Sequence, residues 1–121
     1  MARILVVDDS PTQIQALLKI LVKHGYETLT AEDGETAVNT ARDEKPDLIL
    51  MDVVMPGLNG FQATRHITKN EGTSHIPVIM LSSKDQETDR VWAQRQGAKD
   101  YIIKPAKEDE LISKISALLN T

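Results

Sequence analysis

Polar and charged residues stand at the ends of several short apolar segments of this chain. They are Asp8 and Asp9 after residues 4–7, Asp52 after residues 48–51, Ser82 after residues 78–81, and Lys104 after residues 101–103. If these segments are parallel strands of one sheet, their carboxyl ends share one edge, and open α/β sheets bind ligands at that edge. Three carboxylates, a hydroxyl and an ammonium group would then converge at one point.

The carboxylates of this set indicate a metal site. Three carboxylates packed together repel one another unless a cation neutralises them. The chain has no cysteine, so its ligands would be oxygens, which favour a hard ion such as Mg²⁺ or Mn²⁺. The histidines His24, His66 and His75 are scattered, and no two lie four residues apart, so nothing indicates zinc. The adjacent pair Asp8 and Asp9 is best placed to hold the metal.

The remaining residues suit phosphoryl transfer. Asp52 stands alone at the end of a central apolar segment, and a carboxylate is an adequate nucleophile for a phosphoryl group. Negative charge developing on the phosphoryl oxygens would be shared by the metal, by Lys104, and by Ser82 with nearby backbone amides. Each residue taken alone has a simpler interpretation as a turn former, a helix cap or a solvated lysine. Their joint occurrence favours a shared site.

The sequence alternates short apolar runs with helical periodicity, which predicts βα units and a parallel sheet. The expected strands are residues 3–7, 27–31, 48–51, 78–81 and 100–103. Helices are expected from Pro11 to a stop at Gly25, from Gly34 to Asp43, after the turn at residues 56–60 as far as Lys69, from Gln86 to Gln96, and after Pro105. Four runs are almost continuously apolar, which indicates strands covered by helices on both faces. The weakest run, 27–31, suits an edge.

Helical spacing also predicts which side chains of each helix face the core. These are Ile14, Leu17, Leu18, Leu21 and Val22 in the first helix, Ala37, Val38 and Ala41 in the second, and Leu111, Ile112, Ile115, Leu118 and Leu119 in the last. The helix at 86–96 offers only Val91, Trp92 and Ala93. Whether Trp92 lies in the core or on the surface is left open by this pattern.

Size and charge limit the other possibilities. The chain has 121 residues, enough for one domain, and its net charge of −4 argues against non-specific binding to nucleic acid. No apolar run approaches the roughly 18 residues of a membrane span. Residues 1–3 lead straight into a strand-like run and leave no room for a signal peptide. We therefore expect a cytoplasmic protein that neither binds nucleic acid nor inserts into a membrane.

The strand-end residues and their neighbours form a pattern with a known counterpart. Asp8-Asp9, the segment 51–60 (MDVVMPGLNG), Leu81-Ser82-Ser83 and Lys104-Pro105 resemble the receiver domains of two-component response regulators. The resemblance covers residues 1–121 and implies one receiver domain with no output domain. It also implies the α/β flavodoxin-like (βα)5 fold, a doubly wound five-stranded parallel sheet with strand order 2-1-3-4-5.

The resemblance implies a role for each matching position. Asp52 would accept a phosphoryl group from a histidine kinase or its phosphotransfer domain, in a reaction that depends on Mg²⁺ or Mn²⁺. The metal ligands would be Asp8, Asp9, Asp52 and the backbone carbonyl of Val54. Lys104 would bind the phosphoryl group and would precede a cis peptide bond to Pro105.

The resemblance also implies a switch. The Ser82 hydroxyl would move toward the phosphoryl group, and the Tyr101 ring would turn inward in response. The helix at 86–96, the strand at 100–103 and the last helix would then present a changed surface to an unidentified downstream protein. The protein would otherwise act by draining phosphoryl groups from a shared kinase. A monomer is the expected state.

Two stretches suggest a narrower resemblance. Residues 57–69 and 84–101 are similar to the PilH-type regulators of type IV pilus twitching motility.

Two other functional classes remain to be weighed. A small aspartate-nucleophile phosphatase would carry D-x-D after the first strand, but this chain has Asp8-Asp9-Ser10. A nucleotide-binding module would need a Gly-rich phosphate loop there, and the sequence contains neither of the two usual motifs.

Overall fold

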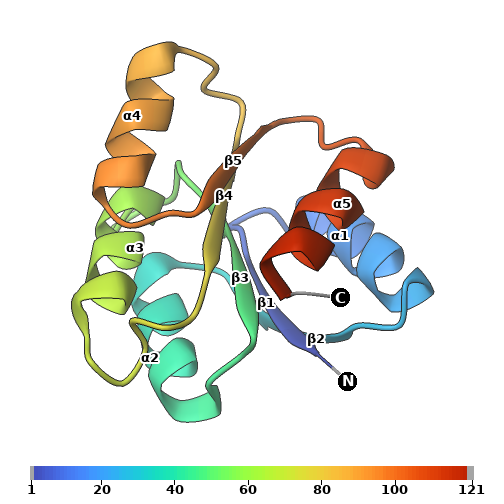
Figure 1. The fold of residues 1–121 in the computed structure, drawn as a ribbon, viewed down its shortest axis with the longest axis horizontal. Helices are drawn as coiled ribbons and strands as arrows, with labels where there is room; N and C mark the ends of the chain where they lie inside the picture. Colours follow the sequence, from blue (N-terminus) through green and yellow to red (C-terminus); the bar gives the residue numbers. More distant parts are fainter. Residues whose placement is uncertain (1, 120–121) are drawn as a thin grey trace.

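The computed structural model describes residues 2–119 and shows five parallel strands, each followed by a helix (Figure 1). In chain order the elements are β1 (Arg3–Val7), α1 (Pro11–Lys23), β2 (Glu27–Ala31), α2 (Gly34–Glu44), β3 (Leu48–Asp52), α3 (Gly60–Lys69), β4 (Val78–Ser82), α4 (Glu87–Arg95), β5 (Asp100–Ile103) and α5 (Glu108–Leu119). The strand order is β2-β1-β3-β4-β5, and all neighbouring strands are parallel. This confirms the predicted flavodoxin-like fold, with β2 at an edge.

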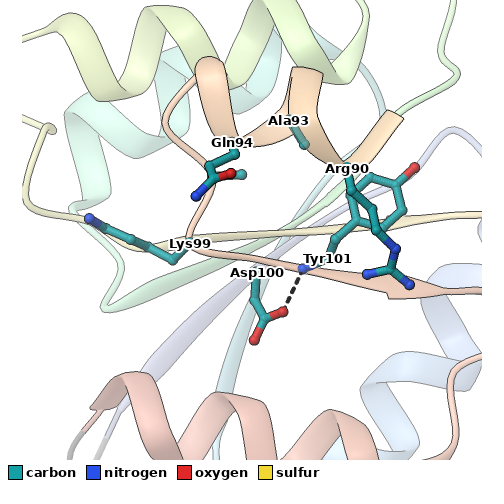
Figure 2. A pocket seen from close by; sticks show the side chains of 7 residues that line it. Arg90, Ala93, Gln94, Lys99, Asp100 and Tyr101 are labelled. Atoms are coloured by element: carbon teal, nitrogen blue, oxygen red, sulfur yellow. Dashed lines mark hydrogen bonds between the residues drawn. The ribbon is translucent and has the colours of Figure 1, made fainter. Parts of the chain in front are cut away.

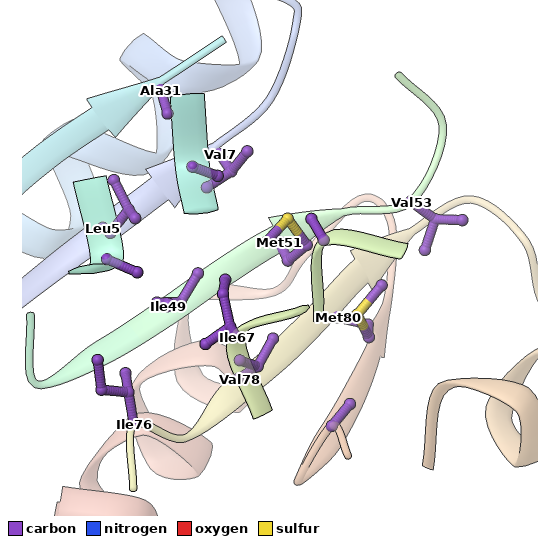
Figure 3. Close-up of a cluster of buried hydrophobic side chains, with 14 of the residues drawn as sticks. Leu5, Val7, Ala31, Ile49, Met51, Val53, Ile67, Ile76, Val78 and Met80 are labelled. Atoms are coloured by element: carbon purple, nitrogen blue, oxygen red, sulfur yellow. The ribbon is translucent and has the colours of Figure 1, made fainter. Parts of the chain in front are cut away.

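The sheet separates two apolar layers. Helices α1 and α5 cover one face, and α2, α3 and α4 cover the other (Figure 1). Because successive strand residues point to opposite faces, each strand serves both layers. In β3, Leu48 and Leu50 pack toward α1 and α5, whereas Ile49 and Met51 belong to the other cluster (Figure 3). All five residues of β3 are buried, which explains its continuous apolar run.

Polar side chains fix where three of the helices begin. Ser10 caps α1, and the Asp33 carboxylate accepts a hydrogen bond of 2.7 Å from the Thr36 amide at the start of α2. At the start of α3, Asn59 and Gln62 each accept a hydrogen bond of 2.9 Å from the other's backbone amide. These caps satisfy amide groups that have no partner within the helix. They fix each turn between strand and helix at the carboxyl edge of the sheet.

The structure corrects part of the predicted core. Val22 is 61% exposed, because the inward face of α1 is centred on Ile14, Leu17 and Leu21, and Val22 lies beyond its margin. Other predicted core residues are only partly buried; they are Leu18, Val38, Ile112, Leu118 and Leu119. Helix α5 begins at Glu108, after Pro105 as predicted.

Helix α4 departs most from its predicted packing. Val91 is 39% and Trp92 is 49% exposed, and Ala93 is the one buried residue of the predicted three. The inward side of this segment uses small or polar residues, since Gln96 and Ala98 just beyond the helix are buried as well. Trp92 is therefore a surface residue.

Candidate functional site

Three of the predicted site residues are joined by direct contacts at the carboxyl edge of the sheet. The Lys104 Nζ donates one hydrogen bond of 3.0 Å to Asp8 Oδ2 and another of 3.0 Å to Asp52 Oδ1. Asp8 and Asp52 are buried, and the Lys104 side chain is 16% exposed. The residues lie just past β1, at the end of β3 and just past β5. Parallel pairing of these strands is what brings them together.

A third carboxylate completes the cluster. One carboxylate oxygen from each of Asp8, Asp9 and Asp52 lies within 4.8 Å of the other two. Asp8 is fixed in place because its Oδ1 accepts a hydrogen bond of 2.9 Å from the Ser10 amide. Asp9 is exposed and has room to adjust. A compact set of hard oxygen donors open to solvent on one side fits a divalent ion such as Mg²⁺.

The charges of the cluster do not cancel. Three carboxylates face one ammonium group, so the formal charge is −2. Burial raises the pKa of Asp52, and the hydrogen bond and charge of Lys104 offset only part of that rise. Burial alone would lower the pKa of Lys104, but its hydrogen bonds to Asp8 and Asp52 outweigh burial and raise it. Lys104 is therefore held as a cation. The negative charge that remains on the cluster favours binding of a second, external cation.

The backbone after Asp52 is held close to α3. The Gly60 amide donates a hydrogen bond of 2.9 Å to the Val53 carbonyl, and a Cβ on Gly60 would lie 2.0 Å from the Asp52 carbonyl oxygen. Only glycine allows this approach. Val54 is 60% exposed, and no donor among residues 2–119 binds its carbonyl oxygen. That oxygen is therefore not committed to a hydrogen bond within the described residues.

Ser82 and Tyr101 meet at the backbone of Lys84, the residue two positions beyond Ser82. The Lys84 amide donates a hydrogen bond of 3.1 Å to Ser82 Oγ, and Tyr101 Oη donates one of 2.9 Å to the Lys84 carbonyl. Both Ser82 and Tyr101 are buried. The Arg90 guanidinium lies 5.4 Å from the centre of the Tyr101 ring (Figure 2). The backbone of Lys84 thus connects the end of β4 with the aromatic residue of β5.

The sequence-predicted residues therefore fall into two neighbouring groups. Asp8, Asp9, Asp52 and Lys104 form one cluster, and Ser82 and Tyr101 form a second group around Lys84. The peptide bond between Lys104 and Pro105 is cis, as the resemblance implied. Sequence reasoning missed Gly60 and Arg90. Gly60 could have been suspected, because glycine opening a helix often marks a close backbone approach.

Comparisons with known proteins identify this arrangement. A family model described as the response regulator receiver domain matches residues 4–116. The chain belongs to this family. Among curated receivers it is 60% identical to protein PilH of Pseudomonas aeruginosa over 119 residues, covering 98% of both chains. It is 39% identical to the Escherichia coli phosphate regulon regulator PhoB, covering 97% of this receiver and 51% of PhoB.

Solved receiver structures have the same fold. The Vibrio cholerae chemotaxis protein CheY4 matches with a TM-score of 0.92 at 29% identity, covering 98% of this receiver and 99% of CheY4. The receiver domain of a Pseudomonas aeruginosa sensor histidine kinase matches with a TM-score of 0.91 at 32% identity, covering 99% and 98%. That structure holds a magnesium ion coordinated in its active-site cleft. Receiver domains are typically signalling modules of two-component systems and not enzymes.

Within residues 2–119, every helix is too short or too polar to cross a lipid bilayer.

Proposed function

We propose that this receiver accepts a phosphoryl group on Asp52 from a phosphohistidine of a histidine kinase or its phosphotransfer domain. The observation that carries the proposal is the contact between Asp52 and Lys104. It pairs a carboxylate at the end of a central strand with a cation that is held charged. The pair lies at the carboxyl edge of the sheet, beside the exposed Asp9.

The transfer balances with the residues present. A carboxylate oxygen of Asp52 attacks phosphorus, an acyl phosphate bond forms, and the N–P bond of phosphohistidine breaks. The electron pair returns to the imidazole, which takes up a proton. Lys104 donates to Asp52 Oδ1, so Oδ2 is the carboxylate oxygen without an ammonium partner. Lys104 then shares the charge of the transferred group, as ammonium groups do in phosphoryl transfer.

The residues around Asp52 also fit a divalent cation. Asp8, Asp9, Asp52 and the Val54 carbonyl would hold Mg²⁺ or Mn²⁺, and the ion would neutralise charge on the phosphoryl oxygens. The magnesium ion in the similar receiver of the Pseudomonas aeruginosa sensor kinase supports this assignment.

Ser82 and Tyr101 would report phosphorylation through the Lys84 backbone. If the Ser82 hydroxyl turns toward the new phosphoryl group, the Lys84 amide loses its acceptor, and the loop that also receives the Tyr101 hydroxyl is released. The surface formed by α4, β5 and α5 would change in consequence. A cavity of about 170 Å³ already lies between α4 and β5, and Arg90 and Tyr101 line it (Figure 2). The surface would bind a downstream protein that is not yet identified.

The identity of 60% with PilH along nearly the whole of both chains supports a narrower role. The receiver would act as a cytoplasmic monomer in the control of type IV pilus twitching motility. It would do so by binding a target or by draining phosphoryl groups from a shared kinase. Nothing in the site favours the small phosphatase considered above.

The test is incubation of the protein with Mg²⁺ and a small phosphodonor, followed by measurement of the intact mass. The wild type should gain one labile phosphoryl group and Asp52→Asn should gain none. Asp109→Asn, an exposed carboxylate on α5, is the matched control and should behave as the wild type. A gain of unchanged size in Asp52→Asn would place the acceptor elsewhere. No gain in the wild type, with either the small donor or a phosphorylated histidine kinase, would contradict the proposal.

A further inference from the structure

A second polar pocket lies at the edge of the sheet opposite Asp52. It is enclosed by the last turns of α3 and α4 and by the segments that lead into β4 and β5. Its volume is about 240 Å³, and its polar lining consists of Thr68, Lys69, Ser74, Arg95, Gln96 and Lys99. None of these residues belongs to the phosphoryl-acceptor cluster or to the Lys84 contacts.

The lining of this pocket is cationic. Lys69, Arg95 and Lys99 are all exposed, and none of them forms an ion pair within residues 2–119. No acidic residue lines the pocket. The nearest acidic neighbour in sequence, Asp100, is bound by the Lys114 ammonium group at 3.1 Å through each carboxylate oxygen. Three unpaired positive charges therefore face one small volume, in a protein whose net charge is −4.

Helix dipoles do not account for all of this charge. Lys69 and Arg95 lie in the last turns of α3 and α4, where cations complement the negative end of the dipole. Each helix end carries about half a negative charge, so the two together offset roughly one of the three cations. Lys99 precedes β5 and belongs to no helix. An excess of about two positive charges remains for an external anion.

A buried side chain provides an independent indication of a ligand. Gln96 is 5% exposed, and its backbone carbonyl accepts a hydrogen bond of 2.6 Å from Thr68 Oγ1. Its side-chain amide has no hydrogen-bond partner among residues 2–119, although every fully buried side-chain polar atom described has one. The amide must therefore reach the open space of the pocket that Gln96 lines. Its N–H groups therefore face the open space of the pocket without a protein partner and are available to a ligand.

We propose that this pocket binds a small, free phosphate-bearing anion with at least two negative charges. Lys69, Arg95 and Lys99 would neutralise the anion, and the Gln96 amide would donate to one of its oxygens. The assignment is independent of the function proposed for Asp52, because it uses no residue of that site.

Trp92 makes the proposal directly testable. It lies one turn before Gln96, is 49% exposed, and is the only tryptophan of the chain. Pyrophosphate is the probe, titrated into the full chain in Mg²⁺-free buffer at constant ionic strength, with Trp92 fluorescence and amide NMR shifts as readouts. A saturable response centred on residues 95–99 is expected, and Asp52→Asn should respond equally.

Charge variants decide the outcome. Lys69→Gln and Lys99→Gln should each weaken pyrophosphate binding roughly tenfold, since a hydrogen bond to a charged group is worth about one decade in affinity. Lys19→Gln, an exposed lysine on α1, is the matched control and should bind as the wild type. The proposal is overturned by a response that does not saturate, by equal binding in all three lysine variants, or by loss of the response in Asp52→Asn.

Discussion

At the scale of single residues, the backbone of Lys84 links Ser82 with Tyr101. Its amide is bound by Ser82 and its carbonyl by Tyr101, so two side chains from different strands hold one residue from opposite sides. Neither contact uses the lysine side chain. The coupling between the two strands therefore depends on the path of the loop after β4. A movement of Ser82 would change its hydrogen bond to the Lys84 amide, and the carbonyl of the same residue binds Tyr101.

Tyr101→Phe tests the strength of this link. The variant removes the hydroxyl that donates to the Lys84 carbonyl and keeps the ring under Arg90. We expect the free energy of unfolding to fall by about 1 kcal/mol, the usual worth of one hydrogen bond, in urea denaturation. Tyr26→Phe is the matched control, because the Tyr26 hydroxyl is 3.5 Å from Ser116 Oγ and the contact is weak. Equal losses in the two variants would contradict a special role for the Lys84 contact.

The wild type and Tyr101→Phe should also differ in how their stability depends on alkaline pH. Burial raises the pKa of Tyr101 above its ordinary value of 10.0, so the folded state favours the neutral phenol more than the unfolded chain does. The stability linked to this group is therefore complete below pH 10.0 and is lost as the pH rises through the raised pKa. Denaturation between pH 9 and 11 should show a steeper loss in the wild type than in Tyr101→Phe. If the free energies of unfolding of the two proteins fell in parallel with pH, Tyr101 would not contribute to the loss of stability at alkaline pH.

At the scale of elements, the sequence could predict the features that depend on periodicity and on chain ends. The five strands and the convergence of Asp8, Asp52 and Lys104 follow from apolar runs and from parallel pairing, which places every strand end at one edge. The packing of α4 could not be predicted in this way. Its buried side is made by Ala93 and by the polar Gln96 beyond the helix. The apolar residues of α4 therefore do not indicate which face of the helix packs against the sheet.

The contacts of Lys84 could not be predicted from the sequence for a different reason. Every residue except proline has both an amide N–H and a carbonyl, so a site made by backbone groups cannot be recognised from residue types.

The exposure of Val22 has a geometric cause: a stripe of five apolar residues is wider than the strip of α1 that the sheet covers.

The cap of α2 offers a test at this scale. Asp33→Ala removes the carboxylate that accepts from the Thr36 amide and should lower the free energy of unfolding by about 1 kcal/mol at neutral pH. Asp33→Asn keeps a good capping side chain and should lose much less. The backbone hydrogen bond from Thr36 lowers the pKa of Asp33 below 3.8, so this stability is present above pH 3.8 and is lost as the pH falls through the lowered pKa.

Chemical denaturation of the wild type, Asp33→Ala and Asp33→Asn at pH 7 and pH 3 checks the cap prediction. The gap between the wild type and Asp33→Ala should narrow at the lower pH. A gap of the same size at both pH values would assign the effect to packing and not to the charged cap.

At the scale of the whole molecule, two clusters of opposite charge lie at opposite edges of the sheet. The carboxyl edge carries three carboxylates against one lysine, and the opposite edge carries the three cations around Gln96. The two clusters share no residue, so a cation at one and an anion at the other would not compete for side chains. Screening weakens any direct influence between exposed charges separated by more than about 8 Å at physiological salt. The two sites should therefore bind their ligands independently.

Metal binding at the carboxyl edge should stabilise the whole fold. A ligand that binds only the folded state adds about 2.7 kcal/mol to the free energy of unfolding at a hundred times its dissociation constant. We expect Mg²⁺ to raise the thermal midpoint of the wild type and to leave Asp9→Asn almost unchanged, because that variant lacks one of the three carboxylates. Asp9 is exposed, so without metal the two proteins should differ by no more than about 0.5 kcal/mol. Asp109→Asn controls for the loss of one negative charge and should respond to Mg²⁺ as the wild type does. An equal Mg²⁺ response in Asp9→Asn would exclude Asp9 from the metal site and leave Asp8 and Asp52 as its only carboxylates.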